Sequence, residues 1–125
     1  MSNPFIEIKD HSISLLKKLG YKHVYDYIPD DGNQFIFFEA MTNVDQYTKD
    51  RTLGQTTLNV QFYDYPDNYN DIVIAIDNLI EALKQNPETE HFSWYIVSSS
   101  SQVVNDTTGS VPLKHGTLNI TLEYR

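Results

Sequence analysis

The chain has 125 residues, no cysteine and a formal net charge of −8. This length suffices for one domain with its own core, and the lack of cysteine excludes disulfide frameworks, thiol nucleophiles and cysteine-based metal sites. Between positions 26 and 81, eleven acidic residues stand against two basic ones. This balance argues against a protein that grips phosphate backbones. No membrane-spanning run or signal peptide is expected.

The first element in chain order is a helix. Asn3 and Pro4 predict its start, because asparagine accepts from free backbone N–H groups and proline fits the first turn. Apolar residues follow at helical spacing, and Gly20 predicts the end. Next come two predicted strands, 22–28 and 34–41, on either side of turn-forming Pro, Asp and Gly.

The spacing of apolar residues changes twice in the middle of the chain. Positions 42–54 are polar, show little periodicity and predict a long loop. Residues 57–65 alternate between apolar and polar side chains, which predicts a strand with one covered face. Residues 70–86 then show helical spacing, and Pro87 predicts the end of that helix.

Two further strands are predicted at 91–97 and 116–124, the second with clean alternation. The segment between them, 98–113, is polar, contains a single charged residue and is far longer than a hairpin turn requires. Long loops in small domains are usually functional or disordered. We therefore expect 98–113 to be a long loop that is either functional or disordered.

Together these elements predict one α+β domain, residues 1–125, in the order α-β-β-β-α-β-β. Strands that follow one another without a helix should pair antiparallel. We expect an antiparallel, possibly mixed, five-stranded sheet with both helices packed on one face. The predicted core joins helix residues to strand residues: Ile76, Leu79, Leu83, Leu58, Val60, Phe62, Ile120 and Leu122.

Catalytic and metal-binding patterns are not found in the sequence. The four histidines lie far apart without a metal-ligand spacing, and no nucleophile has a base at a diagnostic distance. We expect no enzyme activity, no metal and no cofactor. A pocket that gathered His23, His91 or His115 with carboxylates would argue against this expectation. Tyrosine is abundant, and it is enriched at protein interfaces.

The element order, the two long polar connections and the final amphipathic strand resemble the tail terminator, or tail-completion, proteins of long-tailed bacteriophages. The resemblance covers nearly the whole chain and is carried by "PFIEIKDHSISLLKKLG", "TLNVQFYDYPDNYNDIVIAIDNLIEAL" and "GTLNITLEYR". It implies a ring, usually a hexamer, that caps the tail tube, stops tube polymerisation and joins the tail to a head connector or stopper protein. The implied location is the head-proximal end of the virion tail, after synthesis in the host bacterial cytoplasm.

On this interpretation, DNA passes through the ring without specific binding, and acidic residues face the channel. The candidates for the channel wall are Asp64, Asp67 and Asp71. The candidates for the assembly interface are Tyr47, Lys49, Arg51, Tyr63, Tyr65, Val103, Val104 and Val111.

Other function classes stay open at this point. A head-side connector or stopper is the nearest rival, and a cystatin-like or steroid-isomerase-like pocket domain for a small apolar ligand is an alternative from another class. A small enzyme is the third. A pocket domain should be monomeric, with polar groups on the inward strand face, whereas Leu58, Val60 and Phe62 are all apolar there.

Overall fold

The computed structural model describes residues 3–27, 29, 34–47, 52–109 and 111–125. The elements follow in the order α1 (Pro4–Lys18), β1 (Val24–Tyr25), β2 (Phe35–Tyr47), β3 (Thr52–Asp64), a 3-10 helix η1 (Pro66–Asn68), α2 (Tyr69–Gln85), β4 (Trp94–Asp106) and β5 (Leu113–Tyr124). This order differs from the predicted one by η1, which forms the turn between β3 and α2. The predicted α+β class is confirmed.

The boundaries of α1 follow the predicted chemistry. Asn3 Oδ1 accepts a hydrogen bond of 3.1 Å from the backbone N–H of Ile6, and Pro4 occupies the first helical position. Gly20 ends the helix with a φ of +104°, a left-handed conformation that suits glycine. Ser12 is fully buried on the apolar face, where its hydroxyl donates to the Ile8 carbonyl at 2.8 Å.

The five strands form one mixed sheet in the order β1-β2-β3-β5-β4. Strands β2, β3, β5 and β4 pair antiparallel, but β1 runs parallel to β2, with Val24 opposite Ile36. The expected antiparallel pairing of 22–28 with 34–41 is therefore wrong. Nine residues, 26–34, separate the two strands, more than the two to five of a hairpin turn, so the turn-forming composition did not fix the strand direction.

Both predicted polar loops are mostly strand. Positions 42–47 belong to β2 and 52–54 to β3, while residues 98–106 form the second half of β4 and Leu113 begins β5. The prediction was wrong because it treated missing alternation as missing structure. Strand β4 lies at the sheet edge, and Ser98–Gln102 are exposed on both of its faces. Such a strand needs no apolar side chains to keep its ladder.

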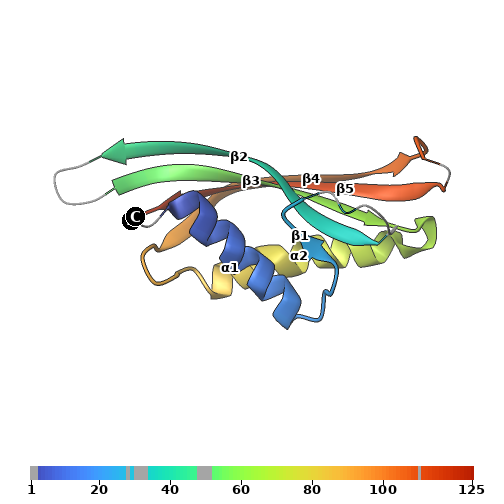
Figure 1. Cartoon of the computed structure of the whole chain (residues 1–125), viewed down its shortest axis with the longest axis horizontal. Helices are drawn as coiled ribbons and strands as arrows, with labels where there is room; N and C mark the ends of the chain where they lie inside the picture. Colours follow the sequence, from blue (N-terminus) through green and yellow to red (C-terminus); the bar gives the residue numbers. More distant parts are fainter. Residues whose placement is uncertain (1–2, 28, 30–33, 48–51, 110) are drawn as a thin grey trace.

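The helices cover one face of the sheet and leave the other uncovered (Figure 1). The predicted core is confirmed. Leu79 and Leu83 of α2 are fully buried with Leu58 and Val60 of β3, and the other predicted core residues belong to the same cluster. Trp94, Leu118 and Tyr124 complete the core at the β4 and β5 side.

Candidate functional site: the uncovered sheet face and the sheet ends

The two long hairpins end at opposite ends of the molecule (Figure 1). Near one end, Tyr47 of β2 pairs with Thr52 of β3; near the other, Asp106 of β4 pairs with Leu113 of β5. Thr108 lies just beyond this second pair, and both its backbone N–H and its hydroxyl donate to Asp106 Oδ1. An elongated sheet with a hairpin at each end offers two separate surfaces to neighbouring molecules.

The uncovered face carries a ladder of polar side chains from β3 and β5. Thr57 lies opposite Thr121, and their hydroxyl oxygens are 3.0 Å apart. Asn59 lies opposite Asn119 in the same register. Cross-strand pairs of this kind stabilise a sheet without making its surface apolar.

Gln61 lies at the centre of a network of side-chain hydrogen bonds in this ladder. It is only 6% exposed, yet all four of its hydrogen-bonding positions are used. The amide nitrogen donates to Glu39 at 3.0 Å and to Asn59, and the amide oxygen accepts from His115 Nε2 and, at 3.1 Å, from Thr117. A carboxylate only accepts, so the amide nitrogen must face Glu39. The proton on Nε2 of His115 is then the one that bonds Gln61.

Aromatic rings continue this face toward the β4–β5 turn. The rings of Tyr63 and His115 stack with centroids 4.3 Å apart, and Phe35 stacks on Tyr63 at 4.8 Å. Burial lowers the pKa of His115, while the carboxylates of Asp106 and Glu39 act in the opposite direction. Burial, together with these two carboxylates, raises the pKa of Tyr63. The neutral forms of both rings are therefore favoured where they stack.

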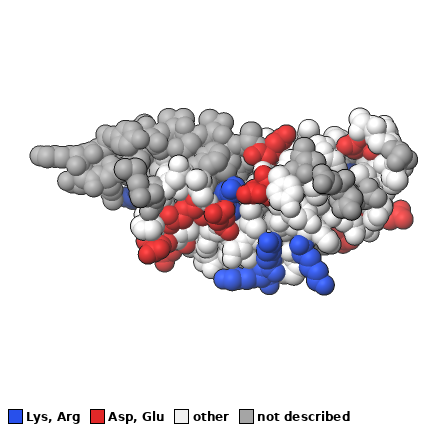
Figure 2. Space-filling view, viewed as in Figure 1, with Lys and Arg blue, Asp and Glu red and all other residues white. Residues whose placement is uncertain are grey.

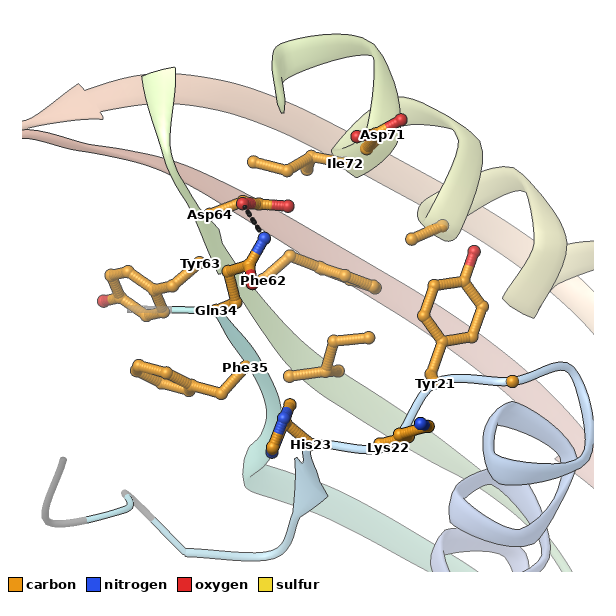
Figure 3. A pocket seen from close by; sticks show the side chains of 13 residues that line it. Tyr21, Lys22, His23, Gln34, Phe35, Phe62, Tyr63, Asp64, Asp71 and Ile72 are labelled. Carbon is orange, nitrogen blue, oxygen red and sulfur yellow. Dashed lines mark hydrogen bonds between the residues drawn. The ribbon is translucent and has the colours of Figure 1, made fainter. Parts of the chain in front are cut away.

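A pocket of about 280 Å³ opens between the end of α1, the start of β2, the end of β3 and the start of α2 (Figure 3). Phe35, Phe62 and Ile72 give it an apolar wall. His23, Asp64 and Asp71 also line it, which brings one of the singled-out histidines together with carboxylates.

Asp64 and His23, two of the polar residues of this pocket, have structural partners. Asp64 Oδ1 accepts from the Gln34 side chain at 2.9 Å, from the Tyr65 backbone at 2.7 Å and from the Asn68 side chain at 2.8 Å. These bonds fix the turn into η1. His23 Nδ1 lies 3.2 Å from the Tyr25 hydroxyl, and Figure 3 shows His23 and Asp71 at opposite ends of the pocket. An acid–base pair requires direct hydrogen-bond reach or one intervening water.

The other histidines lie elsewhere. His91 Nδ1 is 3.1 Å from Glu7 Oε2, which ties the segment before β4 to α1. Burial raises the pKa of Glu7, but hydrogen bonds from Thr89 and His91 outweigh it and hold that pKa below its ordinary value. Within the described ranges, no group of three or more His, Asp or Glu side chains could hold a metal ion. Within the described residues, none of the helices combines the length and the hydropathy that a membrane span requires.

The predicted assembly residues fall into separate groups. Tyr63 and Val104 both lie opposite His115 in the sheet register, on the uncovered face. Val103 lies opposite Gly116 and packs against the core. Tyr65 precedes η1, and Val111 is exposed in the β4–β5 turn. Tyr47 ends β2 at the far end of the sheet, while the remaining two candidates, Lys49 and Arg51, lie outside the described residues.

The three predicted channel residues gather around the turn between β3 and α2. Asp64 ends β3, Asp67 is exposed in η1, and Asp71 is exposed in the first turn of α2. The structure adds a distinction that the sequence did not give, because Asp64 is committed to local hydrogen bonds. Only Asp67 and Asp71 present carboxylates that the turn itself does not require.

The Gln61 network and the Tyr63–His115 stack were not predicted from the sequence. Their signal was present in the alternation of the two strands, which assigned Gln61 and Tyr63 to the polar face. The missing information was the register between β3 and β5, which sets Tyr63 opposite His115 and Gln61 opposite Thr117.

Comparison with known proteins gives a likeness of fold. One chain of a solved structure described as the virion of a native gene transfer agent (GTA) particle superposes with a TM-score of 0.60 at 10% sequence identity. The match covers 90% of this chain and 86% of that one. No protein-family model matches the sequence, and no curated protein matches it either. The fold is thus shared, over nearly its full length, with a chain of a virion.

Proposed function

We propose that this protein is a structural component of a phage-like virion. The observation that carries the proposal is the shared fold with a virion chain over nearly the whole of both chains. The finer proposal is a tail terminator: a ring, with a hexamer as the expected form, on the head-proximal end of the tail tube. There it stops tube polymerisation and contacts the connector or stopper protein on the head side.

The surface of the molecule supports this role. Ring closure by one kind of subunit needs contacts between two different patches of that subunit. The hairpin ends lie at opposite ends of the sheet, and the polar face between them is not covered by the helices (Figure 1). Tyr27, Tyr95 and Val104, all well exposed, add apolar area for such contacts.

We also propose that the protein is not an enzyme. The pocket gathers His23, Asp64 and Asp71, but Asp64 serves the turn into η1 and the other two residues lie apart. Replacing His23 and Asp71 by Gln and Asn should leave tail capping unchanged. Loss of capping in a folded variant would assign the pocket a part in the function.

Growth of tail tubes tests the main proposal. The tube protein encoded by the same genome should polymerise into tubes, and these tubes should stop growing when this protein is added. Electron micrographs should then show an added ring at one end of the tube. Tubes that keep growing, with no density at either end, would refute the tail-terminator role.

The proposed channel wall has its own test. Asp67→Lys with Asp71→Lys should increase binding of double-stranded DNA to assembled rings, because lysines at the wall attract phosphates. Asp64 stays unchanged in this variant, since its bonds to Gln34 and Asn68 hold the local fold. Exposed Glu88→Lys with Glu90→Lys, in the segment before β4, gives a control with the same change in charge.

A pocket domain for a small apolar ligand is the second candidate. The pocket beside Phe35, Phe62 and Ile72 favours it, as its wall is mainly apolar. It predicts a monomer at every concentration and a rise in melting temperature with small aromatic compounds. A head-side connector, the nearest rival of the same class, predicts binding to portal or head proteins in the absence of tail tubes.

A further inference from the structure

The outer edge of β4 has backbone groups that point away from the sheet. Ser93 and Arg125 exchange both backbone hydrogen bonds, at 2.9 and 3.0 Å. This pair shows which residues of β4 bond to β5, because hydrogen-bonded and non-hydrogen-bonded pairs alternate along an antiparallel ladder. The register between β4 and β5 then shows which backbone N–H and C=O groups point toward the open side of β4. They are those of residues 99, 101, 103 and 105. Among the described residues, a backbone hydrogen bond closes this edge only at its start, where Trp94 donates to the Pro87 carbonyl at 2.9 Å.

This edge has few of the features that prevent strand addition. Proteins usually protect exposed edges with lysine, proline, bulges or a covering segment. No charged residue and no proline occurs from Trp94 to Asn105. A bulge interrupts the register at Val97, and beyond it the pairing with β5 is regular from Ser98 to Asp106. Residues 98–102 are exposed, so the helices do not cover this part of the edge.

The opposite side of the sheet offers a matching edge. Strand β1 pairs with β2 only at Ile36 and Phe37, and Ile36 donates its N–H to the His23 carbonyl at 2.8 Å. Among the described residues, none pairs with β2 on this side beyond Phe37. Hydrogen-bonded and non-hydrogen-bonded pairs also alternate between β2 and β3. The backbone N–H and C=O groups of Met41, Asn43 and Asp45 therefore point away from β3, toward the open side of β2.

We propose that the edge of β4 (Ser98–Asn105) pairs with the free edge of β2 (Met41–Tyr47) in a second copy of this chain. The directions of β4 and β2 are compatible with antiparallel pairing. Each antiparallel step from β2 through β3 and β5 reverses the strand, so β4 runs opposite to β2. A second copy therefore presents its β2 antiparallel to β4, with both helix layers on the same side. This copy is displaced sideways and also along the strands, because Met41 lies in the same row of the sheet as Ser99, and Asp45 in the row of Trp94. This inference rests on the proposed ring and names its subunit contact.

Charge distinguishes this contact from pairing of β4 with β4. Helix α2 packs near β4 and carries three acidic residues and one lysine, whereas α1 packs near β1 and β2 and ends in Lys17 and Lys18. Figure 2 shows lysines gathered over the end of α1. Neither of these two lysines forms an ion pair within the described part of the chain. Pairing of β4 with β2 brings α2 beside a neighbouring α1, while pairing of two β4 edges would bring two acidic helices together.

Proline substitutions at outward-facing positions test the contact directly. Ser101→Pro removes a donor from the open edge of β4, and Asn43→Pro does the same on β2; neither removes a hydrogen bond of the ladder inside the chain. Ser101→Ala and Asn43→Ala keep the backbone donors and are the matched controls. Circular dichroism and the melting temperature should show that all four variants fold as the parent does.

The masses in solution then decide the question. At concentrations up to on the order of 1 mM, the parent and both alanine variants should form species larger than a dimer, and each proline variant alone should stay monomeric. An equimolar mixture of the two proline variants should give a 1:1 dimer, since one intact β4 edge meets one intact β2 edge. A monomeric parent, or self-association of Asn43→Pro into dimers, would overturn the inference.

Tail capping separates this inference from the proposed function. If Ser101→Pro caps tail tubes as well as Ser101→Ala, the edge contact is wrong and the tail-terminator role stands. If the parent fails to cap tubes although the mixed proline variants pair, the role is wrong and the edge contact stands.

Discussion

The two faces of the sheet differ sharply although the same strands form them. On the helix side, Leu58, Val60, Leu118 and Ile120 have no exposed surface. On the other side, the same stretches of β3 and β5 present threonine, asparagine and glutamine to each other. The helix side provides the free energy of burial that makes the domain fold. The uncovered side is tied by hydrogen bonds and stays free to meet other molecules.

This difference suggests separate consequences for changes on each face. Substitutions on the helix side should alter the free energy of unfolding. Substitutions on the uncovered side and at the β4 edge should alter assembly more than folding. The following predictions test that separation, beginning with the largest expected effect.

Leu79→Ala should produce the largest loss, about 2–5 kcal/mol in the free energy of unfolding, because Leu79 is fully buried and truncation leaves a cavity. Ile74→Ala on the same helix is the control: Ile74 is 53% exposed and should change stability by less than about 0.5 kcal/mol. Urea denaturation measures both. Equal effects of the two substitutions would contradict the assigned helix face.

Gly116→Ala should destabilise the fold by about 1–3 kcal/mol through overpacking. A Cβ at this position would lie 2.6 Å from Cγ2 of Ile72 and 3.5 Å from Cβ of Phe62. Gly109→Ala in the β4–β5 turn is the matched control, because among the described atoms a Cβ there meets only the Val111 backbone oxygen, at 4.0 Å. Thermal unfolding of both variants gives the comparison. A stable Gly116→Ala protein would mean that α2 lies farther from β5.

Gln61→Leu should cost about 1–2 kcal/mol, because it leaves the side chains of Glu39, His115 and Thr117 without their shared partner. These partners are only partly buried, so water compensates some of the loss. Gln55→Leu, at an exposed position of the same strand and face, should change stability far less. If both variants unfold at the same urea concentration, the network contributes nothing measurable.

His115 should give a small dependence of stability on pH. Its lowered pKa in the folded state means that, below the unfolded value near 6.5, the unfolded chain binds the proton more readily. Stability attributable to His115 is therefore present above about pH 6.5 and is lost as the pH falls. Between pH 7 and about pH 5.5, which is on the order of one unit below the unfolded pKa of histidine, the parent should lose more free energy of unfolding than the His115→Gln variant loses. Identical pH profiles would contradict burial of the ring.

The sequence predicted the helix side of the molecule more accurately than the uncovered side. Alternation in 57–65 and 116–124, with the helical spacing of 70–86, identified the buried residues because burial demands apolar side chains at fixed intervals. The cap at Asn3 and the stop at Gly20 were also predicted correctly, since both depend on local chemistry.

The edges were mispredicted because no apolar pattern marks them. The serines at 98–101 lie in an edge strand that is solvated on both faces, and a polar sequence of this kind cannot be told from a loop by periodicity alone. No local pattern in the sequence encodes the parallel pairing of β1 with β2. The candidate site shares this limit: Tyr63 was singled out as an interface residue, but its stack on His115 requires the register of two strands.

The mass of the complex at the end of a tail tube tests the central claim most directly. Purified tubes, mixed with excess protein and freed of unbound chains, should carry a fixed number of subunits at one end, six for the expected hexamer. That number should not rise with further protein, because a closed ring has no free edge. A single bound subunit, a two-fold dimer, or binding along the whole tube would contradict the account.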